Sequence, residues 1–135
     1  MSSKEQVPGV VAIAAAVSAG ERRAEDVIGE HLARAKAAGG LNALLHVTDE
    51  QALVQARAID ARRERGEALG RLAGVPVVLK DNLCLRGVPT TCASRILAGY
   101  KPPYNADCVE RLLAEDAVMV GKANMDEFAM GSSNE

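Results

Sequence analysis

The sequence has very few aromatic residues: Phe 1, Tyr 2 and Trp 0 among 135 residues. Apolar residues make up 48% of the chain, but many of them are alanines, whose methyl groups contribute far less on burial than leucine or phenylalanine. This apolar share excludes an intrinsically disordered chain. The length fits one domain at most. Because the core is light for that size, we expect the chain to be part of something larger.

Long apolar runs and an excess of positive charge are missing as well. The segment Val10–Val17 is much shorter than the ~20 residues that a membrane helix needs, and it lacks the pattern of a secretion signal. We therefore expect no membrane association and a cytoplasmic protein. Lys and Arg number 16 against 18 Asp and Glu, a net charge of -2. Such a balance provides no basic surface for direct binding of nucleic acid.

Patterns typical of disulfide or metal sites are also absent. The three cysteines, Cys84, Cys92 and Cys108, form no CxxC pair, so we expect reduced thiols and no zinc site. His31 lies on the apolar side of a predicted helix, without a second candidate ligand nearby. A packed histidine is therefore favoured over a metal ligand, and we expect no metal on this chain.

Residues 1–66 have a helical pattern. Apolar residues at helical spacing predict two helices, ended by Gly20 and by Gly39. A short strand over 41–47 is followed by Thr48 and Gln51, which match a capping box that opens a third helix to about Gly66. The arginines of this third helix alternate with acids, which indicates a solvated face and not a binding surface.

The pattern changes at residue 74. The apolar run Val75–Leu79 predicts a strand buried on both faces. An irregular stretch over 83–106 follows, and Asp107 with Glu110 matches a second capping box before a helix. Ala117–Val120 then predicts a second buried strand. Two strands joined through a helix indicate an α/β fold with a mainly parallel sheet.

Lys80 follows the first of these strands directly. Side chains alternate along a strand, so Lys80 shares a face with Val78, and Asp81 points to the opposite face. The carboxyl end of a parallel strand is where open α/β sheets place ligands. A snorkelling lysine is the structural alternative. A phosphate-binding lysine would need a glycine-rich loop, and no GxGxxG motif occurs.

Lys80 has a further use as a base. Burial disfavours the ammonium form of a lysine, and a neutral amine can activate a hydroxyl nucleophile. From the residues alone, the adjacent pair Ser132 and Ser133 is the candidate hydroxyl.

Three segments, residues 74–82, 90–94 and 121–133, resemble the amidase signature family. The resemblance covers most of the chain. It implies that residues 1–135 are the N-terminal portion of a single amidase signature domain, with helices over 1–66 and sheet and site segments over 74–135. The expected fold is α/β, an incomplete domain with N-terminal helices and the first strands of a mainly parallel or mixed sheet.

The resemblance also implies roles for particular residues. Members of the family hydrolyse amides with a Ser-Ser-Lys triad, and Lys80 falls on the position of the catalytic lysine. The two serines would lie beyond residue 135, so Ser132 and Ser133 are not expected to be nucleophiles. Met130, Gly131 and Ser132 would line the substrate pocket instead. At two positions the chain departs from the family pattern: Asp116 stands where Gly is usual, and Ala123 where Thr is usual.

Residues 124–133 most resemble one branch of the family, the ammonia-producing subunit of tRNA-dependent amidotransferases. This resemblance implies glutamine as substrate, and two partners, the B and C subunits of that enzyme. The B subunit would use ATP and magnesium on the misacylated tRNA, and the chain itself would bind no cofactor and meet tRNA only through this partner. We expect the 135-residue chain alone to be inactive. The alternatives are a free-standing amidase for small carboxamides and a catalytically dead interaction module.

Overall fold

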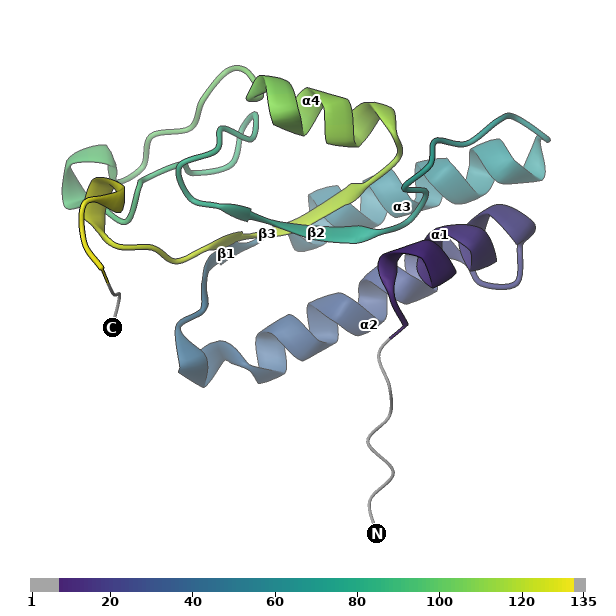
Figure 1. The fold of residues 1–135 in the computed structure, drawn as a ribbon, viewed down its shortest axis with the longest axis horizontal. Coiled ribbons are helices and arrows are strands. Elements are labelled where there is room, and N and C mark those ends of the chain that lie inside the picture. The colour runs from purple at the N-terminus through teal and green to yellow at the C-terminus, as the bar shows by residue number, and fades with distance from the viewer. Residues whose placement is uncertain (1–7, 133–135) are drawn as a thin grey trace, which may run out of the picture.

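A computed structural model describes residues 8–132 of the protein. These residues form four helices, three strands and three short 3-10 turns (Figure 1). In chain order they are α1 (Val10–Ala19), α2 (Ala24–Ala37), the turn Gly39–Leu41, β1 (Leu44–Val47), α3 (Asp49–Glu64), β2 (Pro76–Lys80), the turn Arg95–Leu97, α4 (Asp107–Ala114), β3 (Val118–Ala123) and the turn Glu127–Ala129.

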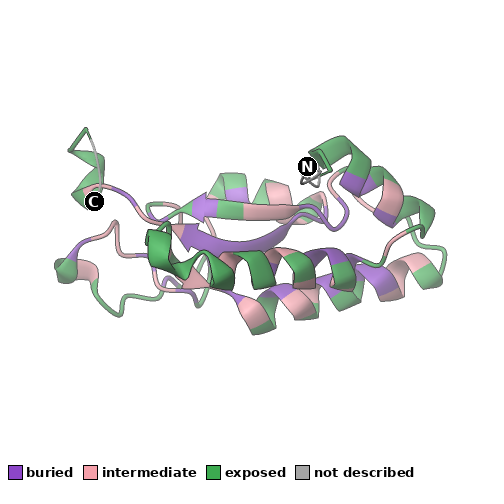
Figure 2. Cartoon of the chain, turned by 90° about the horizontal axis from the view of Figure 1, so that it is seen from below, coloured by how far each residue is buried: buried purple, intermediate pink, exposed green. Residues whose placement is uncertain are grey.

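The three strands form one mixed sheet in the order β1-β3-β2. Strand β2 runs parallel to β3, as the sequence predicts, and β1 pairs with β3 antiparallel. Strand β3 is central and buried on both faces (Figure 2). The prediction that the first apolar strand is buried on both faces is wrong for β2. In the described sheet β2 is an edge strand, and Val78 is 45% exposed.

Helices cover the two faces of the sheet unequally. Helices α1, α2 and α3 pack on one face, and α4 lies on the other (Figure 1). The buried side chains form one apolar cluster on each face. The first cluster, between the sheet and helices α1 to α3, contains several fully buried alanines, which allow the helix backbones to approach closely. The second cluster joins Val109 of α4 to Leu79 and Met119 of the sheet and to Leu85 and Val88 of the irregular stretch. This stretch contains little regular structure, as predicted, and Leu85 and Val88 anchor it in the second cluster.

The ladder between β2 and β3 contains a bulge. Val77 pairs with Met119 and Val78 with Gly121, so Val120 is an extra residue on β3. A Cβ atom added at Gly121 would lie 2.8 Å from the carbonyl oxygen of His46 on β1. Only glycine therefore permits the close approach of β1 at this point.

Two capping predictions are wrong. Thr48 is the N-cap residue of α3, but its side chain caps nothing: Thr48 Oγ1 donates to the carbonyl oxygen of Met119 at 2.6 Å. Helix α4 begins one residue earlier than the predicted box, because Ala106 is its N-cap and Asp107 its first residue. For Thr48 a tertiary hydrogen bond outweighs the local signal.

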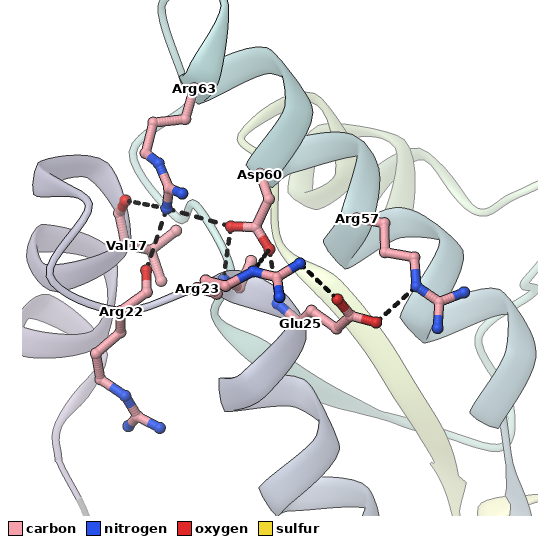
Figure 3. Close-up of polar contacts among 8 residues, drawn as sticks. Val17, Arg22, Arg23, Glu25, Arg57, Asp60 and Arg63 are labelled. Carbon is pink, nitrogen blue, oxygen red and sulfur yellow. Dashed lines mark hydrogen bonds and ion pairs between the residues drawn. The ribbon is translucent and has the colours of Figure 1, made fainter.

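Polar contacts join the three N-terminal helices (Figure 3). Asp60 of α3 is 3% exposed, and its carboxylate accepts the backbone N–H groups of Ala24 at 2.8 Å and Glu25 at 3.0 Å. Arg63 donates to Asp60 and to the carbonyl oxygens of Val17 and Arg22. The arginines of α3 thus lie in intramolecular ion pairs. These pairs are Arg57–Glu25, Arg62–Asp116 and Arg63–Asp60. The predicted solvated face is confirmed for Arg57, whose side chain is 59% exposed, but it is wrong for Arg63, which is only 18% exposed.

Candidate active site

Lys80 is the last residue of β2 and pairs with Ala123 at the end of β3. Its side chain lies on the face opposite to Leu79 and Asp81, both of which are buried, so the predicted alternation is confirmed. Lys80 itself is exposed. The expectation that an apolar strand buries this lysine is wrong for the described structure, because β2 is an edge strand there and the neighbouring Val78 is exposed as well.

Asp81 is fully buried and bonded at every polar atom. Its backbone N–H donates to the carbonyl oxygen of Ala123 at 3.1 Å, and its own carbonyl oxygen accepts from the N–H of Cys92 at 3.1 Å. One carboxylate oxygen accepts from Lys122 Nζ at 2.9 Å, and the other from the N–H and hydroxyl of Thr91 at 2.9 and 2.5 Å. Burial raises the pKa of Asp81, but the hydrogen bonds from Thr91 and Lys122 outweigh it, and the pKa falls below its usual value.

Lys122 is a buried charged residue at this site that the sequence patterns did not identify as a candidate. Its side chain is fully buried, and the ammonium group donates to Asp81, to Thr90 Oγ1 at 3.0 Å and to the carbonyl oxygen of Pro89 at 3.5 Å. An ammonium group has three hydrogens to donate, and each has an acceptor here. A signal was present in the sequence, because Lys122 follows a buried apolar strand just as Lys80 does.

Two loops meet beyond the ends of these strands. The N–H of Phe128 donates to the carbonyl oxygen of Cys92 at 3.0 Å, and the N–H of Cys92 donates to that of Asp81. Ser94 Oγ donates to Glu127 at 2.7 Å. The turn over 127–129 therefore lies against the loop over 91–94 (Figure 1), and both are tied to the end of β2.

The contact between these loops has an unusual backbone. Four non-glycine residues adopt left-handed conformations with positive φ, a state that costs energy for residues with a Cβ atom. They are Cys92 (50°), Ala93 (53°), Phe128 (51°) and Ala129 (57°). Such residues cluster at functional sites, where the surrounding structure holds them in place.

Met130, Gly131 and Ser132 follow the second of these loops and are exposed, with Met130 at 81%. The N–H of Gly131 donates to the carboxylate of Asp126. The structure thus brings the predicted pocket segment to the same edge of the sheet as Lys80. Ser133, the second serine of the pair, lies outside the described residues.

Other features of the described residues contribute no chemistry to this edge. An apolar hollow of about 570 Å³ lies between α1, α2 and the sheet, lined by Val10, His31 and Val78 among others. His31 donates from Nδ1 to the carbonyl oxygen of Val27 at 2.8 Å, as a packed histidine does.

Among residues 8–132 no three His, Cys, Asp or Glu side chains gather as metal ligands would. Within the same range no helix combines the length and the apolar character needed to cross a membrane.

Comparison with known proteins assigns the family of this chain. The family model described as Amidase matches residues 26–135, and the chain therefore belongs to the amidase family. The predicted family and the predicted α/β fold with an incomplete sheet are confirmed.

Curated relatives refine the comparison. The chain is 56% identical over 124 residues to the A subunit of the glutamyl-tRNA(Gln) amidotransferase of Streptomyces coelicolor, a match that covers 91% of the chain and 25% of that protein. It is 64% identical over 97 residues to the A subunit of the glutamyl-tRNA(Gln) amidotransferase of Moorella thermoacetica, covering 72% of the chain and 20% of that protein. The chain thus spans about a quarter of the length of these relatives.

Solved structures show the same fold. One of these structures is a vestigial protein complex that reveals the evolutionary origins of an s-triazine catabolic enzyme. A chain of this complex superposes with a TM-score of 0.87 at 42% identity. That match covers 92% of the present chain and 28% of the other. The peptide amidase of Stenotrophomonas maltophilia superposes with a TM-score of 0.85 at 30% identity, covering 93% of the present chain and 26% of the amidase.

Proposed function

We infer that the chain is part of the glutamine-hydrolysing subunit of a tRNA-dependent amidotransferase. The observation that carries this proposal is the identity of 56% to a relative named as the A subunit of such an enzyme. The site supports it: Lys80 ends a parallel strand at the edge where the segment Met130–Ser132 also lies. In this proposal Lys80 is the base that takes the proton of a serine nucleophile through the middle serine of the triad, and both serines lie elsewhere in the complete protein.

Lys80 is exposed in the described residues, whereas a base requires a neutral amine. In the relatives, about three quarters of the sequence lies outside the stretch that matches this chain. We therefore propose that these further segments cover the face of Lys80 in the complete protein and exclude water from it. Removing water disfavours the ammonium form and leaves the amine able to accept a proton.

The partners follow from the same proposal. Ammonia released from glutamine would pass to the B subunit, which would bind the misacylated tRNA and use ATP and magnesium, and the C subunit would contact the present protein. The net charge of -2 agrees with a protein that meets tRNA only through its partner. Because the reaction acts on charged tRNA, we place the protein in the cytoplasm.

A free-standing amidase for small carboxamides is the alternative with structural support, since the peptide amidase shares the fold at 30% identity. The two functions differ in substrate. The test is the rate of ammonia release by the full-length protein, assembled with its B and C subunits, from glutamine and from a simple carboxamide such as propionamide. We expect release from glutamine and little from the carboxamide. A preference for the carboxamide, retained without the partners, would overturn the proposal, and so would inactivity toward both substrates.

A further inference from the structure

The buried pair Asp81 and Lys122 lies directly behind Lys80, on the other face of the same strand end. Both side chains are 0% exposed, and their charged atoms are 2.9 Å apart. Leu79 pairs with Lys122 and Lys80 with Ala123, so the ion pair joins the last residues of β2 to the last residues of β3. An ion pair in this position holds the two strand ends together from the face opposite to the amine of Lys80.

Stability alone does not account for a pair of this kind. Two buried charges lose hydration, and apolar side chains of similar volume often stabilise a core as well or better. The surroundings are suited to such a replacement, since Leu79, Leu85 and Met119 form an apolar cluster on the same face. What the pair supplies beyond apolar residues is a fixed orientation, because each ammonium hydrogen has its own acceptor and each carboxylate oxygen accepts from one residue, Lys122 or Thr91.

The bulge weakens the control of register between β2 and β3, so a fixed orientation of the pair matters here. After the extra residue Val120, only three paired positions fix β2 against β3, and the last of them holds Lys80. A slip by one residue would turn Asp81 outward and Lys80 into the core, because alternate residues face opposite sides. The ion pair prevents this slip, since Lys122 and Asp81 face each other in one register only.

The pair also anchors the loop that borders the site. Thr91 donates twice to Asp81, and Lys122 donates to Thr90 and to Pro89. The loop over 89–94 is thereby fixed to the strand ends, and through Cys92 it holds the turn over 127–129. The buried pair is the common attachment point of β2, β3 and this loop.

We propose that Asp81 and Lys122 are positioning residues for Lys80: they fix the register of β2 past the bulge and tie the loop over 89–94 to it, so that the amine of Lys80 is held in place on the opposite face. This inference rests on the proposed function, in which Lys80 is the base of an amide hydrolysis. Neither residue is expected to touch the substrate.

The test uses the full-length protein assembled with its partners, and measures kcat and KM for glutamine together with thermal unfolding. Asp81→Asn and Lys122→Met each leave one buried charge unpaired and should lower the unfolding temperature. The double variant carries no buried charge and should recover most of this stability. Its kcat should stay about 10²-fold low, the loss typical of a misplaced catalytic group, with KM near the wild-type value. A stable double variant with wild-type kcat would overturn the proposal and leave the pair a structural feature only.

Thr91 supplies a milder test if the double variant does not fold. Thr91→Val removes the hydroxyl that donates to Asp81 while keeping the shape of the side chain, and Thr91→Ser keeps the hydroxyl. We expect kcat to fall in the valine variant and to be restored in the serine variant, with KM unchanged in both. Equal kcat values in the two variants would contradict a positioning role.

Lys80→Ala separates this inference from the proposed function. If Lys80→Ala abolishes ammonia release while the double and Thr91→Val variants retain wild-type kcat, only the positioning role fails. If Lys80→Ala is fully active, or the wild-type assembly releases no ammonia, the proposed function fails and the positioning role fails with it.

Discussion

Asp60 lies on α3, yet its carboxylate completes the first turn of α2. The first N–H groups of a helix have no partner within the helix, and here two of them donate to Asp60. A residue 36 positions away along the chain thus acts as the cap of α2. The local N-cap residue, Arg23, provides no side-chain cap.

We expect Asp60→Ala to lower the free energy of unfolding by about 2 kcal/mol, the upper range for loss of a helix cap. The buried N–H of Ala24 and the partly buried N–H of Glu25 lose their acceptor, and Arg63 loses its carboxylate. Chemical denaturation of the purified protein measures the effect. Glu64→Ala on the same helix is the control, since Glu64 is exposed and should change stability little. Equal effects of the two substitutions would contradict the capping role.

The lowered pKa of Asp81 predicts that the free energy of unfolding depends on pH in the acid range. Its pKa is lower in the folded protein than its usual value, so its contribution is fully present above about pH 5, where an ordinary aspartate is ionised. The contribution is lost as the pH falls through the lowered pKa, because the unfolded chain then binds the proton more tightly. Wild-type stability should therefore fall more steeply between about pH 5 and about pH 2 than that of Asp81→Asn. Parallel pH curves for the two proteins would show that Asp81 contributes nothing to the acid response.

At the scale of elements, the segment before β2 packs tightly against the end of α4. The N–H of Gly70 donates to the carboxylate of Asp116 at 2.6 Å, and the N–H of Leu72 to the carbonyl oxygen of Glu115 at 2.8 Å. Asp116 has a positive φ of 63°, consistent with its place at a position where the family usually has glycine. Its carboxylate also pairs with Arg62 of α3 at 2.6 Å.

Gly70→Ala should destabilise the protein by about 1–3 kcal/mol, the range for forcing an extra group into a packed site. A Cβ atom at residue 70 would lie 2.5 Å from the Cα atom of Glu115, which is backbone and cannot move aside cheaply. Gly29→Ala is the matched control. Residue 29 lies within α2 with open space around it, so alanine should stabilise the helix by about 1 kcal/mol. Thermal or urea unfolding of both variants checks the opposite signs.

The elements themselves were largely predictable from local patterns. The apolar spacing predicted α1 and α2, and the apolar runs predicted β2 and β3 with Lys80 and Asp81 on opposite faces. What failed depends on distant partners. The hydroxyl of Thr48 is used by Met119, 71 residues away, and the partner of Lys122 is Asp81, 41 residues away. No local pattern contains such pairs, and the exposure of Lys80 depends on β2 being an edge strand.

At the scale of the whole molecule, the chain corresponds to about a quarter of its curated relatives. In the proposed function, the serine nucleophile belongs to the part of the complete protein outside these 135 residues. We therefore expect the isolated chain to release no ammonia from glutamine, because a base without its nucleophile has nothing to activate. A coupled ammonia assay on the purified chain tests this. Ammonia release that is abolished by Ser132→Ala would contradict it and make Ser132 a nucleophile.

The central claim is that Lys80 is the base of an amide hydrolysis. The most direct measurement is the rate of ammonia release from glutamine by the full-length protein with Lys80→Arg, assembled with its partners. Arginine keeps the positive charge but stays protonated in proteins, so it cannot accept a proton. We predict a rate at least about 10²-fold below wild type, with an unchanged circular dichroism spectrum because Lys80 lies at an exposed strand end. A Lys80→Arg variant that keeps most of its activity would contradict the claim and make Lys80 an electrostatic residue.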